Sequence, residues 1–262
     1  MNKAANLMKW VYLILVLLFL YLPIGVMAIQ SFNSGSSISS WEGATFHWYE
    51  ELFAGRNKDI VSALNVTLSV AAIATVVSTV LGTLGAIGIH GMKKRTQGVM
   101  MTLTNLPNTM PDIVTGVSLM LLFIFVAGGE SRGYVTMLLA HITFDTPYVI
   151  LSVLPKLKQM NKHTYEAALD LGATPGYALR KVIIPECRQG IVTGAMLAFT
   201  LSIDDFTISY FTAGSKVQNL SMLIYSAARR HVDGTFYAVS TAMFVVLLIL
   251  LLMVNKHTVQ AD

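Results

Sequence analysis

The sequence predicts an all-α integral membrane protein that crosses the membrane six times. Of its 262 residues 54% are hydrophobic and only 12% are charged, and the mean hydropathy is +0.62, whereas soluble domains carry about 25% charged residues. Six apolar windows are long enough for the roughly 20 residues that a helix needs to cross the hydrocarbon core. They lie near 9–30, 61–90, 99–127, 133–154, 188–212 and 235–254.

Basic residues predict the orientation of these windows. Of the 18 Lys and Arg residues, twelve fall on the side that would hold both termini. The side richer in Lys and Arg is normally cytoplasmic, so we expect both termini inside the cell. The net charge of +4 follows from this topology, and no nucleic-acid partner is needed to explain it.

The first window, 9–30, has two interpretations. It follows Lys3 and Lys9, as the core of a secretory signal would, but it is longer than the about 7 to 15 residues of such a core. We therefore expect a retained membrane anchor. The outer segment from Ser31 to Asp59 continues as WEGATFHWYEELF, whose aromatic residues suit the headgroup layer. This composition predicts a short interfacial helix.

Two windows carry stripes of small residues, which let another backbone approach closely. Ordinary helix packing explains both stripes. The first stripe is Gly82, Gly85 and Gly88, and the second is Gly190, Gly194, Ala198 and Ser202.

The loop HTYEAALDLGATPGYALRKVIIPE, from His163 to Glu186, predicts two short helices that meet at a slim corner. Gly172 favours the left-handed backbone that ends a helix. Thr174 then suits an N-cap, Pro175 the first helical position, and Pro185 a helix end. Either the corner enters a groove on another protein, or the helix pair covers its own transmembrane bundle.

Two adjacent carboxylates, Asp204 and Asp205, lie inside the fifth window. Each costs about 2.5 to 3.5 kcal/mol at the bilayer centre if ionised and exposed to lipid, so both should face protein or water. Residues three and four apart share a helical face. Asp205 therefore joins Ser202, Ser209 and Thr212, whereas Asp204 joins Thr200 and Thr207. The pair could line a cavity or belong to a buried network with these hydroxyls.

Two further aspartates follow or precede a proline. Asp112 follows Pro111, where a span could be broken and its backbone exposed to a cavity; its alternative role is to cap the broken helix. Asp145 lies two residues before Pro147, and its alternative role is local hydrogen bonding near a kink.

Several site classes are not expected. Cys187 is the only cysteine, which excludes a disulfide framework. The six histidines show no metal-ligand spacing, so no metal site is expected. No G-x-x-x-x-G-K-[ST] loop is present, so energy from ATP would have to enter through another subunit.

The loop also carries a family resemblance. E-A-A, a following glycine and I-x-P resemble the EAA loop of permease subunits of bacterial ABC importers, and we refer to His163–Glu186 as the EAA loop. The segments FHWYEELF, MPDIVTGVSLMLLF, HITFDTPYVI and FTLSIDDFTIS are similar to the second permeases of spermidine/putrescine importers, so the resemblance covers most of the chain. Asp145 and the pair Arg229 and Arg230 depart from that pattern. The motif residues are Glu166, Ala167, Ala168, Gly172, Ile183, Ile184 and Pro185.

The resemblance implies a single permease domain, 1–262, with the type I importer core at about 61–254. It implies no catalysis by this chain and no cofactor in it, with ATP and Mg bound by a partner ATPase. The expected partners are a second, homologous permease, two ATPase subunits and an extracytoplasmic substrate-binding protein, in the bacterial inner membrane. The EAA loop would dock on the ATPase through Glu166, Ala167, Ala168, Asp170, Gly172 and Ala173.

A linear polyamine would suit the carboxylates, because its ammonium groups match spaced negative charges with aromatic surface between them. Related permeases for other cationic or metal-chelate substrates share the scaffold.

A proton-coupled transporter would also place carboxylates in spans, but that function does not explain the presence of the EAA loop. A membrane aspartyl protease is disfavoured because neighbours on one helix point about 100° apart. The candidate substrate-binding residues are Asp204, Asp205, Asp112, Asp145, Tyr148 and Tyr210.

Overall fold

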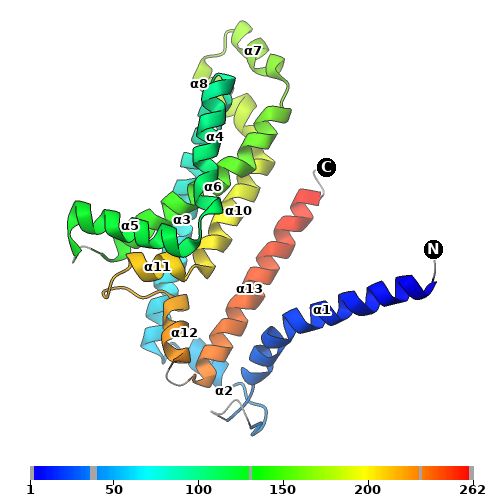
Figure 1. Cartoon of the computed structure of the whole chain (residues 1–262), viewed down its shortest axis with the longest axis vertical. Helices are drawn as coiled ribbons and strands as arrows, with labels where there is room; N and C mark the ends of the chain where they lie inside the picture. The colour runs from blue at the N-terminus through cyan, green and yellow to red at the C-terminus, as the bar shows by residue number, and fades with distance from the viewer. Residues whose placement is uncertain (1–2, 36–39, 130–131, 230–231, 260–262) are drawn as a thin grey trace. The chain divides into compact units, whose positions relative to one another are not determined.

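A computed structural model describes residues 3–35, 40–129, 132–229 and 232–259, and these are built from helices and connecting loops (Figure 1). The predicted all-α class is confirmed. The longer helices are α1 (Lys3–Gln30), α3 (Lys58–His90), α4 (Lys94–Thr109), α5 (Asp112–Ala127), α6 (Tyr134–Gln159), α10 (Arg188–Asp204) and α13 (Gly234–Val259). The shorter ones are α2 (His47–Phe53), α7 (Lys162–Asp170), α8 (Pro175–Ala178), the π-helical turn η2 (Leu179–Ile183), α9 (Ile184–Glu186), α11 (Thr207–Thr212) and α12 (Leu220–Ala228).

Four of the described helices, α1, α3, α6 and α13, are long and apolar enough to cross a membrane. Two bent pairs raise this number to six if each pair forms one span. The axes of α4 and α5 differ by 105°, and those of Pro175–Glu186 and α10 by 72°. The first bend falls at Met110 and Pro111, where the sequence predicted a possible break.

The chain divides into two compact units, 1–61 with 224–250 and 62–223 with 251–262. In the first unit, α2 is the short helix predicted for the outer segment. The indole Nε1 of Trp48 donates to the carbonyl of Asn33 over 2.7 Å, and a Cβ at Gly234 would lie 2.2 Å from the same indole. A glycine is therefore required where α13 begins.

In the second unit, α6 is the helix against which its neighbours pack. It lies beside α10 (Figure 1), and Gly190 and Gly194 bring the two backbones together. A Cβ on Gly190 would lie 2.8 Å from the Ser152 carbonyl, and one on Gly194 3.1 Å from the Cα of Val149. The predicted small face of 188–212 is confirmed as a helix-packing face.

The predicted glycine face of α3 is only partly confirmed. A Cβ on Gly82 would lie 2.5 Å from the Cβ of Val149, and one on Gly85 would lie 3.2 Å from Ile150. A Cβ on Gly88 would meet nothing within 4 Å. Three residues turn a helix by about 300°, so each step of three drifts by about 60° and Gly88 no longer faces α6.

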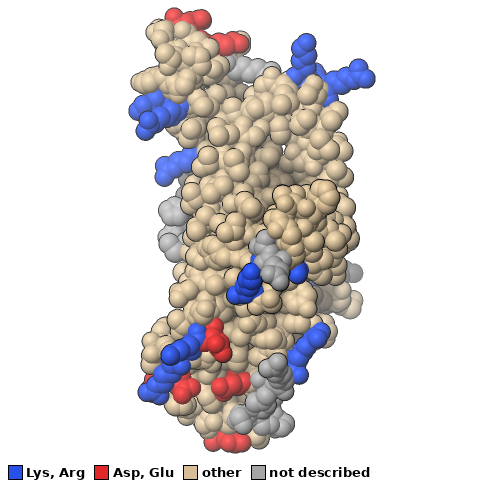
Figure 2. All heavy atoms as spheres, turned by 90° about the vertical axis from the view of Figure 1, so that its left-hand side faces the viewer, with Lys and Arg blue, Asp and Glu red and all other residues tan. Residues whose placement is uncertain are grey.

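The surface agrees with a membrane location. On the face shown in Figure 2 most atoms belong to uncharged residues, and Lys, Arg, Asp and Glu form small separate groups. Large apolar side chains of α1, α3, α5 and α13 are exposed to the surroundings. Lipid tails can cover such surfaces without loss of hydrophobic burial.

Candidate functional site

The EAA loop forms two helical segments joined at a corner, as the sequence predicted. The helix α7 ends at Asp170, and Gly172 follows with φ +84°, a left-handed conformation that costs glycine little. The Oγ1 of Thr174 accepts a hydrogen bond from the amide of Tyr177 over 3.3 Å, and Pro175 occupies the first turn of α8. The predicted N-cap and proline positions are therefore confirmed.

The second segment does not stop at Pro185, and that part of the prediction is wrong. Its backbone widens into the π-helical turn Leu179–Ile183 and continues through α9 to Glu186. Proline lacks the amide hydrogen for an i−4 bond and its ring crowds the preceding turn. A π-helical turn changes the hydrogen-bond register locally, so Pro185 can stand at the start of a new helical turn.

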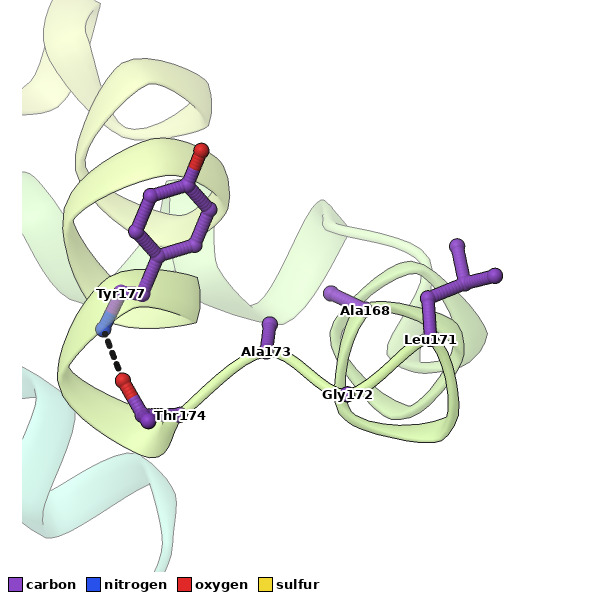
Figure 3. Close-up of a pocket in the computed structure, with 6 residues that line it drawn as sticks. All are labelled: Ala168, Leu171, Gly172, Ala173, Thr174 and Tyr177. Atoms are coloured by element: carbon purple, nitrogen blue, oxygen red, sulfur yellow. Dashed lines mark hydrogen bonds between the residues drawn. The ribbon is translucent and has the colours of Figure 1, made fainter.

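An open surface hollow of about 510 Å³ lies at the corner of the EAA loop. Figure 3 shows Ala168 and Leu171 on the α7 side, Tyr177 on the α8 side, and Ala173 between them. Leu171 is 89% exposed and Tyr177 is 59% exposed. Exposed apolar side chains beside a hollow are typical of a surface that binds another protein. The full lining is Ala168, Leu171, Gly172, Ala173, Thr174 and Tyr177.

The fifth window is not one straight helix, because α10 ends at Asp204 and α11 begins at Thr207. Asp205 lies in the break between them. Its Oδ1 accepts from the amide of Ile208 over 3.1 Å and its Oδ2 from the amide of Ser209 over 2.7 Å. Asp205 therefore caps α11 with its own side chain.

The two adjacent aspartates have different surroundings. Asp204 is exposed, whereas the side chain of Asp205 is only 10% exposed. The periodicity of the sequence placed them on different faces, and that part of the prediction is confirmed. Ser202, Ser209 and Thr212 are buried, and Thr200 is exposed like Asp204. Thr207, which the sequence placed with Asp204, is only partly exposed and lies beyond the break on α11.

Asp205 adjoins a buried network centred on His141 of α6. The imidazole Nδ1 lies 3.1 Å from the Oγ of Ser202, and Nε2 lies 2.9 Å from the Oγ of Ser209 and 3.5 Å from the Oδ2 of Asp205. The Oγ of Ser202 donates to Oδ2 of Asp145 over 2.6 Å. Asp145 is fully buried, and its Oδ1 has no hydrogen-bond partner among the described residues.

The remaining candidates lie around these elements. Asp112 is exposed at the start of α5, and the phenol of Tyr148 on α6 is half-buried. Tyr210 of α11 is 52% exposed, and its ring centroid lies 5.3 Å from that of Phe206. Gly116 of α5 would place a Cβ 2.9 Å from Phe211, so α5 packs closely on α11.

Sequence reasoning missed His141 and Asn219 as members of this site. Asn219 donates through Nδ2 to the backbone carbonyl of Asp205 over 3.0 Å and to the Oγ of Ser209 over 2.8 Å. A histidine four residues before an aspartate inside an apolar window was an available signal. Metal-ligand spacing does not detect such a histidine, and the described residues contain no group of three that could hold a metal.

Comparison with known proteins identifies the family. Residues 78–260 match the model of the binding-protein-dependent transport system inner membrane component. The chain belongs to this family of permease components. As a member of this family it is a transport subunit of an ABC importer, not an enzyme, and ATP hydrolysis is carried out by a separate subunit.

Relatives cover most of the chain. It is 37% identical to the putrescine transport system permease protein PotI of Escherichia coli (strain K12), over 88% of this chain and 83% of that protein. It is 34% identical to the spermidine/putrescine transport system permease protein PotC of Haemophilus influenzae, over 92% of this chain and 93% of that protein.

Solved structures support the fold. A bacterial ABC transporter that imports the acidic polysaccharide alginate matches with a TM-score of 0.69 and 17% identity, over 98% of this chain and 95% of that chain. The MetNI methionine ABC transporter, in an inward-facing form, matches with a TM-score of 0.60 and 18% identity, over 77% of this chain and 94% of that chain. The predicted type I importer permease core is thereby confirmed.

Proposed function

We propose that this permease carries linear polyamines, putrescine or spermidine, into the cell. The relatives at 34–37% identity are named for these substrates. The observation that carries the proposal within this chain is the exposed carboxylate of Asp204 in an apolar span, close in sequence to the exposed ring of Tyr210. A carboxylate binds an ammonium group, and an aromatic face accommodates cations and methylenes.

In this proposal the other candidate residues have separate roles. Asp112 and Tyr148 supply a further negative charge and a phenol to the same pathway, while Asp205 and Asp145 support the site from inside the protein. A substrate with two or more ammonium groups can then pass from one carboxylate to another. Weak and repeated contacts suit a transport path, because a substrate that binds too tightly does not leave.

The assembly proposed around this chain has four further subunits. A second, homologous permease completes the pathway, two ATPase subunits bind ATP and Mg, and an extracytoplasmic protein delivers the substrate. Both termini lie in the cytoplasm, on the side with most Lys and Arg. The EAA loop docks on an ATPase subunit through the hollow at its corner and through Glu166, Ala167 and Asp170, which flank the hollow on α7.

Uptake of labelled putrescine and spermidine by vesicles that carry the full complex tests the substrate. Saturable, ATP-dependent uptake is expected. Asp204→Asn should lower that uptake about tenfold or more, because a charge-assisted hydrogen bond contributes about 1.5–3 kcal/mol. Thr200→Val is the matched control, since Thr200 is exposed one turn earlier on α10 and bonds only the carbonyl of Met196.

Three outcomes would contradict the proposal. No uptake of either polyamine by the intact complex would point to another cationic or metal-chelate substrate on the same scaffold. Normal uptake by Asp204→Asn would show that the pathway does not depend on this carboxylate. Uptake that survives ATP depletion with the membrane gradient held constant would instead indicate a gradient-driven transporter.

A further inference from the structure

His141 connects α6 to both sides of the break between α10 and α11. Its side chain is 2% exposed, and each ring nitrogen contacts a different serine hydroxyl. Ser202 belongs to the last turn of α10 and Ser209 to the first turn of α11. One side chain therefore bridges two helices that the chain itself joins only through Asp205 and Phe206.

The hydrogen bonds of this network run in one direction. A serine hydroxyl has one hydrogen to donate. Ser202 donates its hydrogen to Asp145, so it must accept from the Nδ1–H of His141. The Nε2 of a neutral imidazole then accepts from the hydroxyl of Ser209, which itself accepts from Asn219. Each of these hydroxyl and ring groups thus has a complementary partner when His141 is assigned as neutral with its hydrogen on Nδ1.

This arrangement fixes the position of Asp205. The distance of 3.5 Å between Nε2 and the Oδ2 of Asp205 is too long for a strong hydrogen bond, which agrees with an Nε2 that accepts from Ser209. The carboxylate instead accepts the amides of Ile208 and Ser209. Because His141 holds the hydroxyl of Ser209 and Asp205 holds its amide, the first turn of α11 is attached to both.

We propose that His141 is a positioning residue for transport: it holds α11 at the break so that Asp205 stays turned inward and, of these two adjacent aspartates, only Asp204 is presented to the substrate. The inference rests on the proposed function, because it assigns the two adjacent aspartates their roles in one pathway. A buried polar network whose groups are paired fixes a unique local structure. His141 does not contact the substrate in this scheme, and it acts through Ser202, Ser209 and Asp205.

Hydrogen exchange of the purified complex tests the structural half without any substrate. His141→Leu removes both hydrogen bonds, and amide exchange in a peptide that spans 205–212 should become about tenfold faster. His141→Gln keeps a polar group near the position of Nε2 and should restore slow exchange in part. Thr143→Val on the same helix is the control, because Thr143 is exposed and bonds only the carbonyl of Leu139.

Uptake measurements test the functional half. In His141→Leu the maximal rate of uptake should fall about tenfold or more, while the half-saturating concentration, which the binding protein sets, stays unchanged; His141→Gln should recover part of the rate. Exchange or uptake in His141→Leu equal to that of Thr143→Val would overturn the proposal. A wild-type complex that transports no polyamine would contradict only the proposed substrate, because the exchange measurement does not depend on it.

Discussion

Asp204 and Asp205 are adjacent in the chain but face different environments, because α10 stops between them and Asp205 caps the next helix. An ionised carboxylate inside a membrane must face water, a cation or hydrogen-bond donors. Asp205 is satisfied by two backbone amides, whereas Asp204 is exposed and has its charge available for a ligand. The break in the helix thus separates a structural carboxylate from a candidate binding one.

Cys187, between α9 and α10, gives a prediction at the same scale. The thiol is 1% exposed, and burial together with the charge of Glu186 raises its pKa. A raised pKa means less thiolate at neutral pH, and the thiolate is the species that reacts. Maleimide should therefore label Cys187 roughly tenfold more slowly at pH 7 than an exposed thiol, with the rate rising only at higher pH.

The reference thiol for this measurement is Ser215→Cys in a Cys187→Ala background, because Ser215 is exposed in a turn. Labelling is followed by mass spectrometry from mildly acidic to mildly alkaline pH. Equal rates for the two thiols at neutral pH would show that the environment of Cys187 opens in solution.

At the scale of elements, α6 organises the second unit because its neighbours present glycines to it. Gly82 of α3 and Gly194 of α10 both approach Val149. Without a hydrophobic difference between lipid and side chain, such close backbone contacts are a main source of helix association in membranes. The positions of α3 and α10, and with them the break at Asp205, depend on these contacts.

Two glycines of α3 provide a matched pair of substitutions. Gly82→Ala places a methyl group 2.5 Å from Val149 and should destabilise the protein by about 1–3 kcal/mol through overpacking. Gly88→Ala enters open space and should be neutral or stabilising by up to about 1 kcal/mol, since alanine favours the helix. Thermal unfolding in detergent compares the two variants, and equal midpoints would mean that α3 and α6 are not in contact in solution.

The sequence predicted helices better than it predicted their ends. Periodicity correctly separated the buried Ser202 from the exposed Thr200, because both lie on α10 and a 3.6-residue repeat applies within one helix. The break at Asp205 was not predicted, since its surroundings include His141, which lies far earlier in the chain. The helix through Pro185 was also missed, because a local rule for proline does not anticipate a π-helical turn.

At the scale of the whole molecule, the proposed function requires a membrane pathway and a surface for another subunit in one chain. The family assignment means that the chain works with an ATPase and a substrate-binding protein. In the proposed function, energy passes between the EAA loop and the break at Asp205, both of which lie in the unit 62–223. The helix α10 runs from the end of this loop to Asp204 and is a direct connection between them.

Leu171→Arg tests whether the hollow in the EAA loop transmits that energy. Gly172 is a poorer choice, because its φ of +84° would strain any other residue as well as crowd the hollow. Leu171 is 89% exposed, so Arg should leave the fold intact while placing a bulky charge at the docking surface. ATP hydrolysis by the complex should continue, while uptake and its stimulation by loaded binding protein fall about tenfold or more.

Lys181→Ala is the control, because Lys181 is exposed on the same loop but does not line the hollow. Hydrolysis and uptake are measured on the same reconstituted complex, so that their ratio reports coupling independently of the amount of protein. If Leu171→Arg keeps the ratio of the wild type, the ATPase contacts a different surface of the loop. If both activities fall together because the ATPase no longer co-purifies, the hollow provides the attachment itself, since an apolar anchor at a docking surface can carry most of the binding energy.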